Sequence, residues 1–205
     1  MSKKLRYLLV AAALGACSGE PASEPPLAQS GGAVASCATR AYDHIGGPFS
    51  LINETGEAVT EKDFKGGHSL VFFGFTYCPD ICPSTLVTID RALQRLPEEV
   101  ARPKTILISV DPERDTPEAL TEYLRAPQFP DDITALTGPL SAIEDAAGAF
   151  KAGFARIDTP DSLGDYTMDH SSIIYLMDED WSLKTFFTHE ATAETIGDCL
   201  TEILK

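Results

Sequence analysis

Residues 69–83 read SLVFFGFTYCPDICP, and this stretch decides the fold class. Its continuous apolar run is typical of a strand that is covered on both faces of a sheet. The run leads straight into two cysteines, Cys78 and Cys82, and Pro83 suits the first turn of a helix. The stretch therefore predicts a central strand, a turn that carries two cysteines, and a helix.

Predicted strands and helices alternate on both sides of this stretch. A turn signal at residues 54–56 separates two short extended segments, which predicts a hairpin before the central strand. The further predicted strands are 104–110, 133–136, 172–177 and 183–187, and the further helices are 116–124, 140–150 and 192–204. This order predicts an α/β, thioredoxin-like fold, with a mixed central sheet, helices on both faces and an N-terminal β-hairpin extension.

The composition indicates one folded domain and excludes one class of partner. The 205 residues are 43% hydrophobic and 23% charged, which is enough for one substantial core. The formal net charge is −15 at pH 7. A surface of this sign repels phosphate backbones, because no counterion release is available to drive binding. Nucleic acid is therefore excluded as a partner.

The first residues have the layout of a signal peptide. Basic residues within 1–6 precede an apolar run at 7–16, which ends at Cys17. A helix of that length spans about 15 Å, half of the hydrocarbon layer, so a transmembrane anchor is the poorer interpretation. The segment LGAC at 14–17 is similar to a bacterial lipobox. It predicts a lipoprotein-type signal peptide, residues 1–16, that is cleaved before Cys17; ordinary secretory cleavage that leaves Cys17 free is the alternative.

Residues 17–44 are rich in proline, alanine, serine and glycine, which predicts a flexible tether. A lipid on Cys17 would hold the tether at a membrane without any spanning helix. We therefore expect the folded part, residues 45–205, on the periplasmic side of a bacterial membrane, anchored as a lipoprotein.

Cys78 and Cys82 are four residues apart where a loop becomes a helix, so both thiols can face the same way. This spacing suits one shared metal ion, and it could also close into a disulfide after a modest rearrangement. A helix N-terminus favours the thiolate that both uses require, whereas the negative charge of Asp80 opposes it. An inert buried pair is the remaining alternative. Phe75 and Tyr77 are expected to form the core and the walls of the site.

A two-thiolate site needs a third ligand to hold copper in both oxidation states, because Cu(I) is content with sulfur whereas Cu(II) prefers to add imidazole. His170 is the strongest candidate. It lies in the polar segment TMDHSS at 167–172, which we expect to be a loop that approaches the cysteine turn. His44, His68 and His189 lie in the end of the tether, in a loop and near the last helix, and are weaker candidates.

The acidic residues after the strand at 104–110 have two interpretations. Asp111 and Asp115 could orient a partner at the edge of the site, or Asp115 and Thr116 could cap the next helix. Capping is the favoured interpretation. Asp169 could support its neighbour His170 or contact a partner.

Three separated motifs resemble the Sco/SenC family. They are CPDICP at 78–83, SVDPERDTP at 109–117 and YTMDHS at 166–171. The match covers about residues 45–205. The resemblance implies a thioredoxin-like domain that binds one copper ion, Cu(I) or Cu(II), through Cys78, Cys82 and His170. It also implies a role in building the dinuclear copper site of cytochrome c oxidase subunit II.

Two functions use the same residues. The first is a copper metallochaperone that delivers its ion to subunit II or to another copper protein, with other copper chaperones and thiol reductants as further partners. The alternative is a thiol-disulfide oxidoreductase, in which Cys78 and Cys82 are a redox-active pair that reduces the cysteines of that target. A thiol peroxidase is a weaker alternative, because Thr76 is spaced differently from the peroxidase threonine and no arginine can be assigned to the sulfur. Whether the protein is an enzyme thus depends on the second function.

Cys37 and Cys199 remain, in a chain that we expect to be exported, where disulfides persist. We expect a bridge between them that clips the end of the tether to the last helix.

Overall fold

The structure is a computed structural model, and it describes residues 37, 44–160 and 164–205. The predicted signal peptide and the predicted tether, apart from Cys37 and His44, lie outside the described residues. Within the described part, no helix combines the length and the apolar character needed to cross a membrane.

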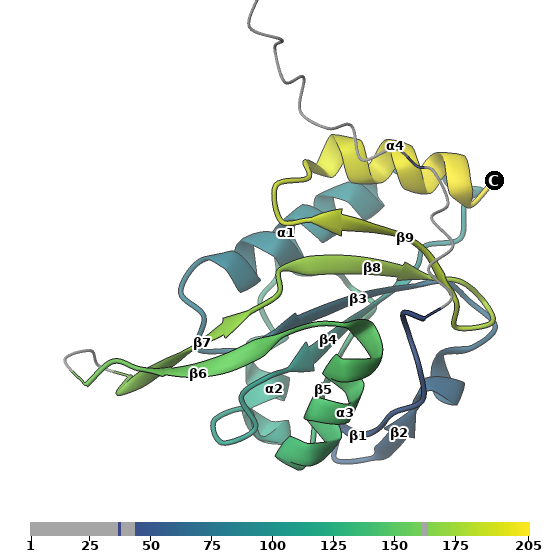
Figure 1. Ribbon diagram of the computed structural model, residues 1–205. Coiled ribbons are helices and arrows are strands. Elements are labelled where there is room, and N and C mark those ends of the chain that lie inside the picture. Colours follow the sequence, from purple (N-terminus) through teal and green to yellow (C-terminus); the bar gives the residue numbers. More distant parts are fainter. Residues whose placement is uncertain (1–36, 38–43, 161–163) are drawn as a thin grey trace, which may run out of the picture. The chain divides into compact units, whose positions relative to one another are not determined.

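A seven-stranded mixed sheet forms the centre of the fold (Figure 1). In spatial order its strands are β2 (Ala58–Thr60), β1 (Ser50–Asn53), β5 (Ile133–Thr137), β4 (Lys104–Ser109), β3 (Ser69–Gly74), β8 (Ile173–Met177) and β9 (Leu183–Thr188). The three middle strands β5, β4 and β3 are parallel, and the outer ones pair antiparallel. All residues of β3 are buried, which confirms the predicted central strand.

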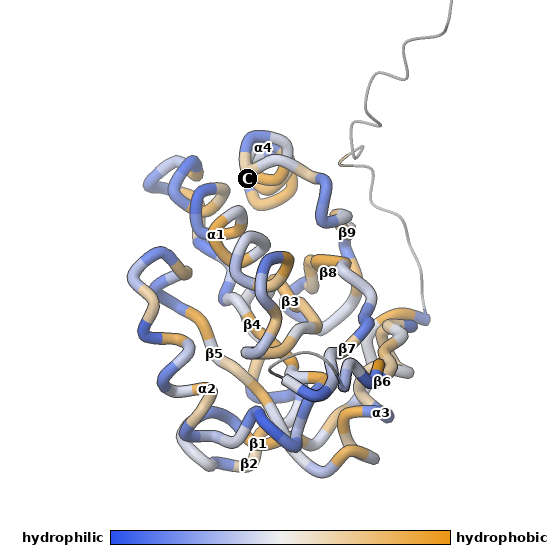
Figure 2. Tube along the Cα trace, turned by 90° about the vertical axis from the view of Figure 1, so that its left-hand side faces the viewer, coloured by the Kyte–Doolittle hydropathy of each residue, from blue (hydrophilic) through white to orange (hydrophobic). Residues whose placement is uncertain are grey.

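Helices cover both faces of this sheet. They are α1 (Ile81–Gln94), α2 (Pro117–Tyr123), α3 (Leu140–Phe150) and α4 (Ala193–Ile203), with a short 3-10 helix, η1 (Glu61–Phe64). The helices α1 and α4 pack against each other on one face, and α3 lies on the opposite side (Figure 2). The buried residues of α1 include Leu86, Ile89 and Leu93, whose spacing gives the helix one apolar face. The predicted mixed sheet with helices on both faces is confirmed.

Two hairpins extend this core. The antiparallel pair β1 and β2 confirms the predicted N-terminal hairpin, which joins the edge of the sheet beside β5. A second hairpin consists of β6 (Phe154–Asp158) and β7 (Tyr166–His170), which form a separate two-stranded sheet. The prediction of a loop around His170 is therefore wrong. Side chains along a strand point to opposite faces in turn, and in β7 Tyr166 is buried whereas Asp169 is exposed. Pairing with β6 also gives hydrogen-bond partners to backbone N–H and C=O groups that a loop would leave to water.

A disulfide joins Cys37 to Cys199, with Cα atoms 5.2 Å apart. Cys199 is fully buried on α4, and Cys37 packs against the same core. This confirms the expected bridge to the last helix.

Candidate metal centre

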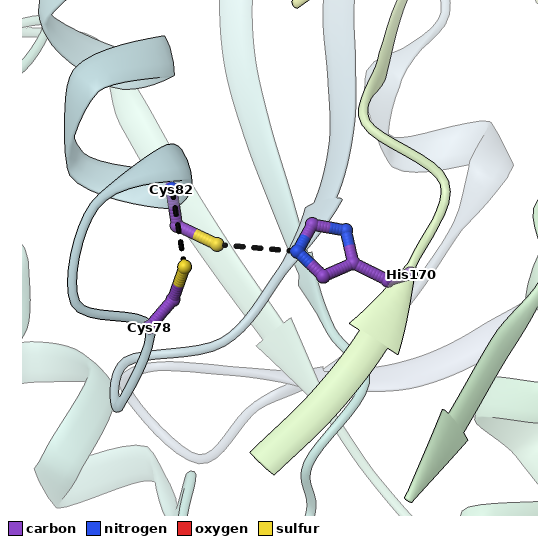
Figure 3. A group of neighbouring side chains, drawn as sticks. All are labelled: Cys78, Cys82 and His170. Carbon is purple, nitrogen blue, oxygen red and sulfur yellow. Dashed lines mark hydrogen bonds between the residues drawn. The ribbon is translucent and has the colours of Figure 1, made fainter. Parts of the chain in front are cut away.

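The two motif cysteines lie where the chain passes from β3 to α1. Cys82 is in the first turn of α1 and is fully buried, whereas Cys78 precedes the helix and is partly exposed. The backbone N–H of Cys82 donates a hydrogen bond to Sγ of Cys78 at 3.3 Å (Figure 3). Because the first N–H groups of a helix have no partner within the helix, this sulfur takes the place of a capping oxygen.

Gly74, at the end of β3, makes room for the buried sulfur. A Cβ atom at this position would lie 3.0 Å from Sγ of Cys82 and 2.9 Å from the Phe72 ring. A side chain there would displace the sulfur from its place against the sheet. The glycine in the apolar run therefore shapes the site.

His170 reaches the cysteines from the end of β7. Its Nε2 lies 3.5 Å from Sγ of Cys82. Its ring stands edge-on to two buried rings, with centroid distances of 6.0 Å to Phe72 and 5.8 Å to Phe75. Its Nδ1 lies 3.3 Å from the carbonyl oxygen of Ser171. With a metal bound, a proton on Nδ1 donated to that oxygen would leave Nε2 free to bind the ion on the side that faces the sulfurs. In the metal-free protein Nε2 can hold the proton instead and donate it to a sulfur.

The ligand atoms of Cys78, Cys82 and His170 all lie within 4.8 Å of one another. No other group of this kind is found among the described residues, so His44, His68 and His189 belong to none there. Two soft sulfurs and one imidazole suit copper or zinc and do not suit hard cations such as magnesium. The structure thus brings together the three residues that the sequence singled out.

The two cysteines have opposite acidities. Interaction with the Cys82 side chain, together with hydrogen bonds from His170 and from the backbone N–H groups of Cys82 and Asp80, lowers the pKa of Cys78 to about 4. The neighbouring Cys78 sulfur and burial raise the pKa of Cys82. Asp80 thus helps the thiolate through its backbone N–H. The two shifts thus favour the thiolate at Cys78 and the thiol at Cys82.

Asp115 anchors the cysteine loop and does not cap α2. It is fully buried, and its carboxylate accepts hydrogen bonds from the hydroxyl of Ser109 (2.5 Å) and from the backbone N–H (3.1 Å) and hydroxyl (2.5 Å) of Thr76. Thr116 alone caps α2, through the N–H of Ala119. The favoured prediction for Asp115 is therefore wrong. A fully buried carboxylate needs several donors, and the start of the cysteine loop supplies them.

The other residues that the sequence singled out lie around this centre in different environments. Phe75 forms a buried wall against His170, as expected, but Tyr77 is 54% exposed beside Cys78. Asp169 points to solvent, and the contact to Nδ1 of His170 comes instead from the Ser171 carbonyl oxygen. The hydroxyl of Thr76 is committed to Asp115, which weighs further against a peroxidase.

The comparisons with known proteins agree with this geometry. The sequence model of the SCO1/SenC family matches residues 38–205. An SCO2-like protein of Rickettsia prowazekii is 38% identical over 152 residues, which are 74% of this chain and 73% of the relative.

Solved structures are similar over most of the described part. The crystal structure of Arabidopsis thaliana ScoI with copper bound has a TM-score of 0.72 at 35% identity, over 77% of this chain and 96% of that chain. The structure of BsSco, described as a Sco-family cytochrome c oxidase assembly protein with a disulfide switch, has a TM-score of 0.59 at 28% identity, over 80% of this chain and 97% of that chain. The thioredoxin-like fold is thereby confirmed, and the chain belongs to the SCO1/SenC family.

Proposed function

We propose that this protein binds one copper ion through Cys78, Cys82 and His170 and delivers it to the dinuclear copper site of cytochrome c oxidase subunit II. The observation that carries the proposal is the convergence of the three ligand atoms within 4.8 Å. Copper is the cargo of this function, and the protein is in the first place a metallochaperone.

The donor set supports copper in both oxidation states. Two sulfurs satisfy Cu(I), and the imidazole of His170 adds the nitrogen that Cu(II) prefers. The low pKa of Cys78 supplies a thiolate without loss of a proton at neutral pH. The copper bound to the similar Arabidopsis protein supports the same cargo here.

Delivery requires an accessible ligand, and Cys78 provides one. It is partly exposed beside the exposed Tyr77, whereas Cys82 is buried. A target thiolate can therefore approach the copper from the side of Cys78 and replace the ligands one by one. The description of BsSco as a cytochrome c oxidase assembly protein supports subunit II as the target.

The predicted signal peptide and the predicted tether indicate the compartment in which copper is delivered. We propose that residues 1–16 are removed, that Cys17 carries the lipid, and that residues 17–44 tether the domain on the periplasmic side of a bacterial membrane. Another copper chaperone would supply the ion there, and a thiol reductant would keep Cys78 and Cys82 reduced.

The acidity of Cys78 favours a second candidate function, thiol-disulfide exchange. The Cys78 thiolate would attack a target disulfide and form a mixed disulfide, releasing one target thiolate. Cys82 would then attack Sγ of Cys78, lose its proton and release the second target thiol. The target disulfide gains two electrons as Cys78 and Cys82 form a disulfide. The disulfide switch described for BsSco supports this candidate.

A transfer assay with the copper-binding domain of subunit II tests both candidates. Copper-loaded protein is mixed with the reduced, metal-free domain, and reduced metal-free protein is mixed with the oxidised domain. We expect copper in the first mixture to move to the domain, and the His170→Ala variant to fail in loading with Cu(II). Reduction of the domain without any copper transfer would instead establish the oxidoreductase.

A further inference from the structure

Arg114 lies between the two segments that carry the metal ligands. It follows β4, and its guanidinium carbon is 4.7 Å from the ring centroid of Tyr77 and 3.7 Å from that of Tyr166. Tyr77 is the immediate neighbour of Cys78, and Tyr166 begins β7, the strand that ends at His170. One planar cation thus stacks with rings from both segments.

Hydrogen bonds fix this cation in place. Its Nε donates to Asp111 at 2.5 Å, and one terminal nitrogen donates to the carbonyl oxygens of Tyr166 at 3.1 Å and Gly164 at 3.4 Å. The buried Asp111 also accepts the hydroxyl proton of Tyr166 at 2.7 Å. Arg114 and Asp111 together therefore hold the backbone, the ring face and the hydroxyl of Tyr166.

The β6–β7 hairpin depends on side-chain contacts for its position relative to the central sheet. β6 and β7 pair with each other and with no strand of the central sheet, so no backbone ladder fixes their distance from β3 and α1. Near His170, the backbone N–H of Ser171 donates a hydrogen bond to the carbonyl oxygen of Gly153. These residues directly flank β7 and β6, so this bond does not attach the hairpin to the central sheet either. At the other end, Gly164 packs so closely on Tyr77 that a Cβ atom there would lie 2.9 Å from the Tyr77 ring.

We propose that Arg114 is a positioning residue, which locks β7 to the cysteine loop and so keeps the imidazole of His170 within reach of the sulfurs. The proposal deepens the proposed copper function and rests on it. The two sulfurs are sufficient ligands for Cu(I), whereas Cu(II) also needs the imidazole. Loss of the Arg114 contacts therefore weakens Cu(II) binding more than Cu(I) binding.

The Arg114→Lys variant tests the lock, because lysine keeps the charge but loses the planar fork and the stacking. We expect Cu(II) retention against a competing chelator to fall about 10- to 100-fold, the range for residues that orient a metal ligand, while Cu(I) retention stays near the native value. The control is Arg156→Lys. Arg156 stacks with the same Tyr166 ring at 3.7 Å, but its ion pairs with Glu113 and Asp158 are exposed. We expect this control to change Cu(II) retention by less than about threefold.

A second variant, Gly164→Ala, perturbs the same contact from the other side, because its Cβ would push against Tyr77. We expect it to shift Cu(II) retention in the same direction as Arg114→Lys. Native Cu(II) retention in Arg114→Lys would overturn the proposal, and so would an equal loss of Cu(I) and Cu(II), which indicates general destabilisation.

Hydrogen exchange of the metal-free protein separates this proposal from the copper function. Arg114→Lys should speed the exchange of the β6 and β7 amides while leaving those of β3 and β4 unchanged. If the native protein binds no copper, the copper function fails, and this measurement still shows whether the lock exists. Unchanged exchange in the hairpin would contradict it.

Discussion

Two pairs of cysteines in this chain have two sulfur atoms each, but the sulfurs are in different states. Cys37 and Cys199 are 162 residues apart in the sequence and form a disulfide. Cys78 and Cys82 are four residues apart, and neither is in a disulfide. Closeness in the sequence therefore does not decide which pair is bridged.

The surroundings explain the difference. The bridge attaches Cys37 to the fully buried Cys199 on α4, so its effect is to restrict the chain. Cys78 instead accepts the N–H of Cys82 at the start of α1, and His170 lies beside Cys82. N–H donors and an imidazole favour a thiolate that can bind a metal or exchange. One pair thus restricts the chain, whereas the other keeps its two sulfurs unbridged beside an imidazole.

The largest effect is expected for Cys82→Ser. It removes one of two sulfurs, and the remaining Cys78 and His170 give a poor site for Cu(I). We expect loss of tight copper binding, by more than about 100-fold, because Cu(I) depends on soft sulfur ligands. The measurement is copper retention against a chelator. Tight copper in this variant would show that the two sulfurs do not share one ion.

His170→Ala should separate the two candidate functions. Cu(II) binding should fall by about 100-fold, while reduction of a target disulfide should persist, because dithiol exchange uses only Cys78 and Cys82. Cu(II) binding and the rate of disulfide reduction are measured on the same preparation. An equal loss of both activities would contradict the assignment of His170 as a ligand.

The low pKa of Cys78 makes the stability of the protein and the reactivity of this cysteine depend on pH. Its pKa is lowered from 9.0 to about 4, so the folded protein holds a thiolate where the unfolded chain holds a thiol. The resulting contribution to stability is full above pH 9.0 and is lost as the pH falls towards about 4. Alkylation of the reduced, metal-free protein, followed by peptide mapping, should modify Cys78 down to mildly acidic pH and leave Cys82 untouched. A Cys78 rate that follows an ordinary thiol pKa would refute this difference.

The smallest effect on the copper site is expected from the double variant Cys37→Ser/Cys199→Ser. Copper binding should be unchanged, whereas the free energy of unfolding should fall by up to about 4 to 5 kcal/mol, since the bridge closes a long loop. Denaturant unfolding and copper titration of the same samples measure the two effects. Weakened copper binding in a folded double variant would show that the two cysteine pairs are coupled.

Local patterns were sufficient for much of the fold and the site. The apolar run at 69–75 and the cysteines after it predicted β3, the turn and α1, because burial and helix initiation are encoded by neighbouring residues. His170 needed one further step, the approach of its segment to the cysteine turn. The structure confirms that approach, although the segment is a strand.

The long-range contacts of Asp115 and Arg114 could not be predicted. Asp115 lies next to Thr116, so a local pattern favours helix capping, yet its carboxylate serves Thr76, which is 39 residues away. Arg114 likewise contacts Tyr77 and Tyr166 through the packing of three separate segments. The alternation along β7 was the available signal for the second hairpin, but a strand of five residues in which only Asp169 is exposed gives a weak pattern.

The most direct test of the copper centre is titration of the reduced native protein with Cu(II), recorded by visible spectroscopy and by metal analysis after removal of unbound ion. The structure predicts one copper per chain and a sulfur-to-copper charge-transfer band, because Cys78, Cys82 and His170 form one centre. Rapid oxidation of Cys78 and Cys82 to a disulfide, with no copper retained, would contradict the proposed copper site.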